Sequence, residues 1–149
     1  MIDSARILAF RWAREPGLWI VAAATALYAC VVVPYWQPTW DSATYITLAK
    51  SLVSGDGYTY MGYDHTKYPP GFPLMLAPIV AMFGRSFLLM RCLEAACAVA
   101  AIGVAYALLR RAAGVGIAAA AATMTAASYA LLFEATRILS DLPYMLVSL

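Results

Sequence analysis

The stretch WDSATYITLAKSLVSGDGYTYMGYDHTKYPPGFP, from Trp40 to Pro73, decides how this chain is organised. It holds three aspartates, the one histidine and two lysines, in a chain that is 64% hydrophobic and only 12% charged. Soluble domains carry about 25% charged residues. With a mean hydropathy of +0.74, the composition predicts an integral membrane protein whose polar chemistry gathers in this one segment.

Net charge and cysteine usage exclude two other classes of protein. The net charge is only +2, so we expect no nucleic-acid partner. Cys30, Cys92 and Cys97 all fall in apolar stretches, and an odd number of such cysteines argues against a disulfide framework. No Cys/His spacing is typical of zinc. We therefore expect no metal ligands and no cofactor, and leave a divalent cation open.

Apolar stretches on both sides of this segment predict an all-α membrane protein with several spans. The predicted spans are residues 17–36, 86–109 and 112–133. The basic residues that flank them are Arg6, Arg11, Arg14, Arg110 and Arg111. By the positive-inside rule these arginines are cytoplasmic. We expect a multi-pass protein of the plasma or inner membrane with its N-terminus in the cytoplasm and the lipid bilayer as a partner.

The first and last apolar stretches of the chain each need a separate interpretation. A cleaved signal peptide is the alternative for the first span, but its apolar run is long and no A-x-A site follows it. At the other end, a further apolar stretch runs only from Leu142 to Leu149. A span needs about 20 residues. We therefore expect the complete protein to continue with further spans, and this chain alone to be inactive.

Residues 37–85 then form one long extracytoplasmic loop. Within it, the thirteen residues of Gly71–Phe83 include two prolines, which favours an interfacial or re-entrant helix over a span. If this segment crossed the bilayer, Arg110 and Arg111 would face outside, against the positive-inside rule. The same topology brings Glu134–Asp141 to the external face, so Asp41 and Asp141 are expected on one side of the membrane.

The start of the loop predicts a short amphipathic helix from Asp41 to Val53. Its apolar positions follow the helical period and are Tyr45, Leu48, Ala49, Leu52 and Val53. Gly55 ends the helix. Asp41 at its start is a favoured N-cap, and that structural role is compatible with a chemical one because a cap fixes the direction of the carboxylate. A hairpin or turn is expected next, and two prolines then hold the backbone at Tyr68 extended.

Several cationic side chains could bind an anion or could simply be satisfied by neighbours. His65 and Lys67 could contact an anion or be solvated. Arg91 could offer a guanidinium to a phosphate, or could pair with Glu94 three residues later on the same helix face. Arg137 and Asp141 are four residues apart and could pair in the same way.

At this point the ordered motifs resemble a known family. The sequence "WDSATYITLAKSLVSGDGY…YPPGFPLMLAPIVAMFG", followed by "TRILSDLPYMLV", looks like the first external loop and the later acidic segment of GT-C membrane glycosyltransferases. The closest groups are the protein O-mannosyltransferase-like and lipid A aminoarabinose-transferase-like branches. Many members carry Asp-Glu where this chain has Asp41-Ser42.

The resemblance implies a multi-span GT-C bundle that moves a sugar from a polyprenyl-phosphate carrier to a glycan, lipid or protein acceptor, with inversion. It implies that Asp41 and Asp141 are the two catalytic-site acids, with Asp41 as the general base. The candidate substrate and phosphate contacts are Tyr45, His65, Lys67, Tyr68, Arg91 and Arg137. A multi-span transporter and a non-catalytic membrane fragment are the alternatives. A transporter would place ionisable residues at mid-membrane, whereas most of these lie in predicted loops.

Overall fold

The computed structural model of the chain describes residues 15–149 and is mostly helical. The predicted cytoplasmic arginines Arg6, Arg11 and Arg14 lie outside the described residues. The elements are α2 (Pro16–Val31), α3 (Trp40–Ser54), β1 (Thr59–Tyr60), β2 (Tyr63–Asp64), α4 (Gly71–Phe83), α5 (Phe87–Ala113), α6 (Val115–Ala126), α7 (Tyr129–Glu134) and α8 (Asp141–Ser148). The predicted all-α class is confirmed.

Helix α5 is the one helix among residues 15–149 that is long and apolar enough to cross a membrane. Its 27 residues extend about 40 Å, against about 30 Å of hydrocarbon. It is longer than the predicted span 86–109 because Arg110 and Arg111 continue the helix. Gly114 then ends it with a φ of +87°, a conformation that favours glycine.

The boundaries predicted for the other two spans are wrong. Helix α2 ends at Val31 rather than Trp36, because Pro34 disfavours helical backbone at Val33. The stretch 112–133 is divided: α6 ends at Ala126, and Ser128 adopts extended backbone before α7 begins. The apolar helices α2, α4 and α6 are each shorter than 18 residues, so none of them meets the length of a span alone.

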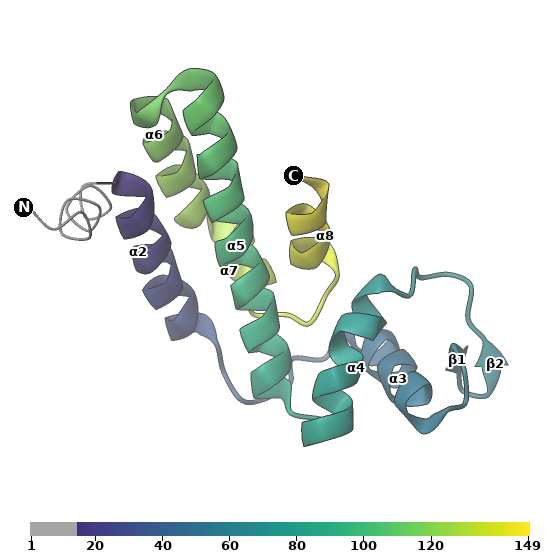
Figure 1. Cartoon of the computed structure of the whole chain (residues 1–149). Helices are drawn as coiled ribbons and strands as arrows, with labels where there is room; N and C mark the ends of the chain where they lie inside the picture. The colour runs from purple at the N-terminus through teal and green to yellow at the C-terminus, as the bar shows by residue number, and fades with distance from the viewer. Residues whose placement is uncertain (1–14) are drawn as a thin grey trace, which may run out of the picture.

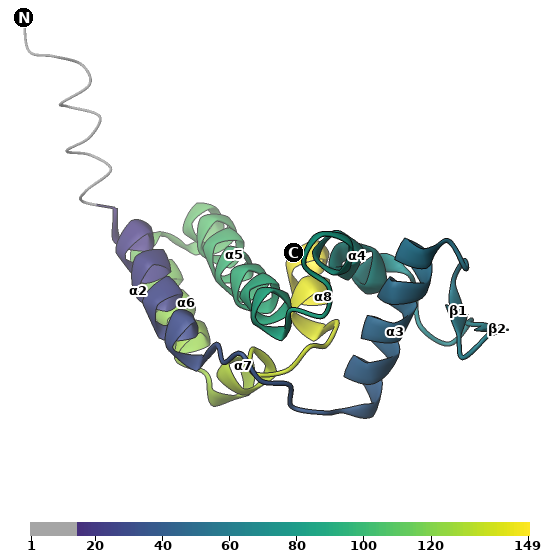
Figure 2. The ribbon, with the colours of Figure 1, turned by 90° about the horizontal axis from the view of Figure 1, so that it is seen from below.

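The helices form two groups (Figure 1 and Figure 2). Helices α2, α5 and α6 lie side by side, while α3, the β1–β2 hairpin and α4 form a lobe beside the N-terminal end of α5. We call this second group the lobe. Helix α8 stands between α5 and α4 in both views. Residues 37–85, predicted as one external loop, are therefore folded around helices of their own.

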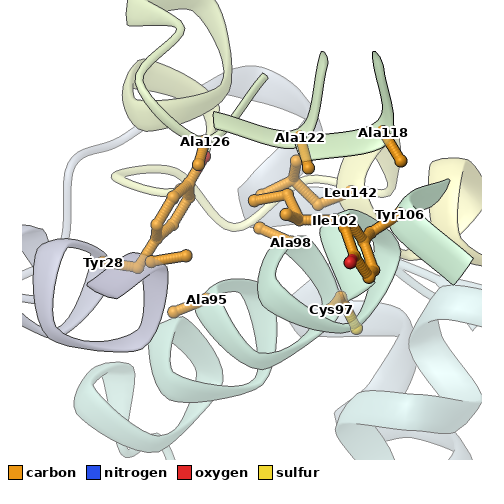
Figure 3. Close-up of a cluster of buried hydrophobic side chains, with 12 residues drawn as sticks. Tyr28, Ala95, Cys97, Ala98, Ile102, Tyr106, Ala118, Ala122, Ala126 and Leu142 are labelled. Atoms are coloured by element: carbon orange, nitrogen blue, oxygen red, sulfur yellow. The ribbon is translucent and has the colours of Figure 1, made fainter. Parts of the chain in front are cut away.

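Small side chains let the upright helices approach closely. Ala118, Ala122 and Ala126 recur every fourth residue along α6 and are all buried against α2 and α5 (Figure 3). Tyr28 of α2 and Ile102 of α5 fill the space between them, and both are fully buried. This is the close packing that the Ala-rich stretch predicts for membrane helices.

The lobe has its own apolar cluster, which also attaches it to the rest of the chain. The cluster consists of Tyr45, Ile46, Ala49, Phe72, Leu76, Met90 and Ile138. It joins α3 and α4 to the start of α5 and to the segment before α8. The predicted amphipathic face of α3 is confirmed at Tyr45, Leu48 and Ala49, whereas the last turn leaves Val53 exposed.

The predicted hairpin and the predicted helix at 71–83 are both present. Thr59 pairs with Asp64 and Tyr60 with Tyr63 in an antiparallel ladder. Met61 and Gly62 connect the strands with φ values of 53° and 84°, as in a two-residue type I′ turn. Helix α4 has the predicted bounds Gly71–Phe83, and its orientation in a membrane stays a prediction.

The N-cap of α3 is Thr39, not Asp41 as predicted. The Thr39 side chain accepts a hydrogen bond from the Ser42 backbone N–H at 3.2 Å, and the Ser42 hydroxyl accepts one from the Thr39 N–H at 3.1 Å. This reciprocal capping box starts the helix one residue earlier. Asp41 lies in the first turn, so its carboxylate is not used as the cap.

Replacing the cap should therefore weaken the start of α3 more than replacing the acid. We expect Thr39→Ala to cost about 1 kcal/mol, which makes amide exchange in the first turn of α3 about fivefold faster. Asp41→Asn should change this exchange less, because Asp41 is not the cap. Hydrogen–deuterium exchange on the purified protein measures both. Equal effects of the two variants would contradict this assignment of the cap.

Candidate active site

Asp41 lies beside an aromatic side chain that comes from the far side of the hairpin. The Tyr68 hydroxyl donates a hydrogen bond of 2.5 Å to Asp41 Oδ1. The carboxylate is half-buried, and no second side chain of residues 15–149 donates a hydrogen bond to it. One oxygen of Asp41 is thus held in place, and the other can accept a proton from a bound molecule.

Tyr68 is itself held from three directions. Its backbone N–H donates to His65 Nε2 at 3.2 Å, and the two rings stack with centroids 5.4 Å apart. The Tyr58 hydroxyl donates to the carbonyl oxygens of Tyr68 and Pro69 at 3.0 and 3.2 Å. The prolines, His65 and Tyr58 therefore fix Tyr68, and through it Asp41. His65, predicted as an anion contact, here supports the backbone.

Lys67 supplies the cation of this arrangement. Its ammonium lies 4.9 Å from the centre of the Tyr68 ring, and its side chain is exposed. Contact with the Tyr68 side chain raises the pKa of Lys67. The lysine therefore stays charged at physiological pH, next to the aromatic ring that holds Asp41.

The second acid comes from the start of α8. Asp141 is the first residue of that helix and is exposed, and Ser140 precedes it. The Tyr45 and Ser140 hydroxyls are 3.0 Å apart and share a hydrogen bond. Tyr45 also packs on Tyr68 at 5.1 Å between ring centres and meets Phe72 edge-on at 5.0 Å. Tyr45 therefore joins the Asp41 side of the site to the Asp141 side.

The electrostatics of Tyr45 reflect both acids. Burial raises the pKa of Tyr45, the hydrogen bond with Ser140 lowers it, and the negative charges of Asp41 and Asp141 raise it further. The net shift is upward, so the phenol stays protonated and can donate a hydrogen bond at physiological pH. Both carboxylates lie close enough to this hydroxyl to act on it.

A hollow of about 460 Å³ opens beside Tyr45, between the lobe and α8. It is lined by Tyr45, Pro69, Gly71, Phe72, Met75, Ser140, Asp141, Pro143, Tyr144 and Val147. Most of this wall is apolar, and its polar groups are the Asp141 carboxylate and the hydroxyls of Tyr45, Ser140 and Tyr144. Asp41 does not line the hollow itself and is linked to it through Tyr68 and Tyr45. The shape suits a ligand with a polar group and an apolar body.

The two arginines differ from their predicted pairings. Arg91 is fully buried, none of its three side-chain nitrogens has a hydrogen-bond partner among residues 15–149, and its guanidinium lies 5.9 Å from the Tyr35 ring. The possible Arg91–Glu94 ion pair is absent from the described chain, and Glu94 contacts the Leu139 backbone instead. Arg91 does not line the hollow.

Arg137 lies outside any helix, in the segment between α7 and α8. The four-residue spacing to Asp141 therefore does not stack the two side chains on one helix face. Its guanidinium instead lies 4.1 Å from the Phe133 ring, a cation–π contact. The possible ion pair with Asp141 is not formed, which leaves that carboxylate open to the hollow.

The sequence interpretation missed Ser140, Tyr58 and Tyr144. Ser140 carries a recognisable signal, because a serine directly before an acid and an apolar run is typical of a helix start. Tyr58 and Tyr144 carry no such signal, since their positions depend on how α8 and the hairpin pack. Among residues 15–149 no three His, Cys, Asp or Glu side chains gather as a metal site, and metal dependence stays a prediction.

Comparisons of the chain with protein-family models, with curated proteins and with solved structures find no match. The resemblance to GT-C glycosyltransferases therefore remains an interpretation of the motifs and their order.

The Tyr45–Ser140 hydrogen bond should hold α8 against the lobe. Removing the hydroxyl in Tyr45→Phe deletes that bond while keeping the ring contacts, so we expect a loss of about 0.5–1.5 kcal/mol. Amide exchange in α8 should become about 2- to 10-fold faster. Tyr144→Phe is the matched control, because the Tyr144 ring is largely exposed. Unchanged exchange in Tyr45→Phe would show that the bond does not couple the two parts.

Proposed function

We propose that this chain is the N-terminal part of a GT-C-type membrane glycosyltransferase that uses a polyprenyl-phosphate sugar. The observation that carries the proposal is that one tyrosine links the residues that position two acids. Tyr45 contacts Tyr68, which binds Asp41, and also bonds to Ser140, which precedes Asp141. A carboxylate held by a tyrosine near an exposed lysine, and a second carboxylate without an ion pair among residues 15–149 in the wall of an apolar hollow, support a chemical role.

The lining of the hollow supports the proposal of a lipid-linked substrate. Its apolar part is formed by side chains such as Phe72, Met75 and Val147, and its polar part includes Asp141. A polyprenyl-phosphate sugar has the same division, with an apolar chain joined to a charged and hydroxylated head. Lys67 is an exposed cation whose charge interacts with that of Asp41, and it suits the phosphate of such a head. Arg91 would need a rearrangement to reach it.

In the proposed reaction Asp41 acts as the general base. An acceptor hydroxyl or amine attacks the anomeric carbon, Asp41 takes its proton, and the bond from that carbon to the phosphate oxygen breaks with inversion. The electron pair leaves with the polyprenyl phosphate, where Lys67 stabilises the charge. Tyr68 is a positioning residue, because it holds one carboxylate oxygen so that the other faces the acceptor. Asp141 orients the acceptor at the hollow.

Membrane insertion is part of the same proposal. Helix α5 would cross the bilayer. Helix α2 with the extended residues that follow it, and α6 with α7, would cross alongside it, with the ends near Arg110 and Arg111 in the cytoplasm. Helix α4 would lie at the outer interface. The lobe is at the other end of α5 from these arginines, which supports an extracytoplasmic position for the candidate site (Figure 1).

Cysteine labelling tests this orientation. In a background without Cys30, Cys92 and Cys97, a membrane-impermeant maleimide added to intact cells should label Asp56→Cys and not Arg111→Cys. Both positions are exposed, so accessibility in the folded chain is matched. Lysed cells should label both and provide the control. Labelling of Arg111→Cys alone in intact cells would reverse the topology and remove the site from the outer face.

Substitution of the two acids tests the chemistry. Asp41→Asn keeps the shape and an oxygen for Tyr68 but cannot take a proton, so transfer should fall about 10²- to 10⁴-fold. Asp141→Asn should lower transfer less, and Tyr68→Phe should lower it while raising the disorder of Asp41. The measurement is transfer from radiolabelled polyprenyl-phosphate hexoses and pentoses, in membranes holding the complete protein that we expect to contain this chain.

Two exposed side chains of the hairpin give matched controls. Asp64→Asn and Tyr63→Phe make the same chemical changes at positions without contact to Asp41, so both should keep near-normal transfer. If Asp41→Asn is expressed and inserted at the normal level and still transfers sugar at the normal rate, Asp41 is not the base. If sugar transfer falls as much in Asp64→Asn as in Asp41→Asn, the assignment of Asp41 as the base is also contradicted.

A further inference from the structure

A second groove runs between α2 and α5, away from the candidate active site. Two hollows of about 490 and 480 Å³ lie along these helices and share Val21 in their walls. The first reaches Arg110 and Arg111, and the second reaches Val32 and Cys92. Because they share a residue and the same two helices, they form one continuous feature, which we call the α2–α5 groove.

The groove follows a regular pattern in both helices. From α2 and the residue that follows it, the wall takes Gly17, Val21, Thr25, Ala29 and Val32. From α5 it takes Cys92, Ala96, Gly103, Ala107 and Arg111. Successive members of each set are three, four or seven residues apart, so each set lies along one helix face. Small side chains line the groove: a Cβ added at Gly103 would make an ordinary contact with Val21 at 3.5 Å, whereas one at Gly17 would clash with the Tyr106 ring.

One end of the groove is positively charged. Glu15 forms an ion pair of 2.9 Å with Arg110, and it also accepts a hydrogen bond from the Tyr106 hydroxyl. Glu15 is therefore engaged, and Arg111 is exposed with no ion pair among residues 15–149. The rest of the groove is aliphatic apart from Thr25, Tyr28 and Cys92. An unpaired cation thus stands at one end of a long apolar wall.

We propose that the α2–α5 groove binds an anionic phospholipid, with the lipid phosphate at Arg111 and one acyl chain along Val21, Ala96 and Gly103. The charge at the groove's end selects an anion, and the apolar wall selects an attached hydrocarbon chain. From Gly17 to Val31 helix α2 rises about 21 Å, more than the roughly 15 Å depth of one leaflet. An acyl chain that starts near Arg111 therefore fits within the groove.

The proposal rests on the membrane insertion of the proposed function and not on sugar transfer. The basic end of the groove is opposite to the lobe, so this lipid is separate from the polyprenyl-phosphate substrate. If the wild-type protein transfers sugar normally but binds no anionic phospholipid, only this inference is contradicted. Loss of transfer in Asp41→Asn with normal lipid binding would concern the active site alone.

Native mass spectrometry of the purified, delipidated protein tests the groove, with phosphatidylglycerol and phosphatidylcholine of matched acyl chains as probes. We expect phosphatidylglycerol to bind at least about fivefold more tightly, the effect of about one basic residue at an anionic head group. Arg111→Gln should remove this preference. Arg85→Gln removes the same charge beside the opposite end of α5 and should keep it.

Filling the groove tests the acyl-chain position. Gly103→Leu should reduce binding of both lipids about tenfold, whereas Gly116→Leu makes the same change at an open position of α6 and should not. Ala96→Leu, also on the exposed wall, is a second filling variant should Gly103→Leu fail to fold. Circular dichroism and monodispersity in detergent verify the fold of each variant.

Four outcomes would overturn the proposal. Equal binding of the two lipids would remove the anion site, and equal losses in Arg85→Gln and Arg111→Gln would make the preference a general effect of charge. Unchanged binding in a folded Gly103→Leu or Ala96→Leu would place the chain elsewhere. A photocrosslinker at Ala29 should capture lipid; capture of another segment of the complete protein would make the groove a helix-packing surface.

Discussion

The hydroxyl of Tyr45 is the contact on which the candidate site depends. It lies on α3, in the lobe, and bonds to Ser140 at the start of α8. Without it the lobe and α8 would be joined mainly by apolar packing, which fixes distance but not direction. The hydrogen bond sets how α8 approaches α3, and therefore where Asp141 lies relative to Tyr68 and Asp41. A single buried phenol thus relates two acids that are far apart in the sequence.

The capping of α3 explains how Asp41 can take a chemical role. A carboxylate used as an N-cap is occupied by backbone N–H groups and aimed at its own helix. Here Thr39 and Ser42 satisfy those groups, and Ser42 also accepts a hydrogen bond from the Trp36 indole at 3.2 Å. The acid stays in the first turn, where the positive end of the helix favours its charge. Its carboxylate is left to Tyr68.

The two ends of α5 have different chemistry. At one end it packs against the lobe, with Met90 in the lobe's apolar cluster and Arg91 fully buried beside it. At the other end Arg110 pairs with Glu15 and Arg111 stays exposed. Basic residues at one end of a long apolar helix agree with the proposed orientation in a membrane. The proposed enzyme site and the proposed lipid groove follow from these two ends.

The sequence by itself determined the helical class, the hairpin and the bounds of α4, because these follow from local rules. Apolar periodicity, the two-residue turn and the prolines before Gly71 act over a few residues each. It also pointed to Asp41, Tyr68 and Asp141 as neighbours of one external site. The helix ends predicted for α2 and α6 differ from those observed. The mainly apolar sequence continues past Val31 and Ala126, whereas the helical backbone ends at these residues.

Only the tertiary structure decided which side chains meet. Asp41 and Arg91 contact Tyr68 and Tyr35, which come from other segments of the chain. Arg137 does not pair with Asp141, because no helix joins α7 to α8. No local sequence pattern contains this information. Pairing rules at spacings of three and four assume a continuous helix and matching rotamers. Arg137 fails the first condition, and Arg91 is turned toward Tyr35 instead of Glu94. The direction of a side chain is set by packing. The sequence therefore indicates which residues are candidates for the site, and only the tertiary structure determines which of them lie together.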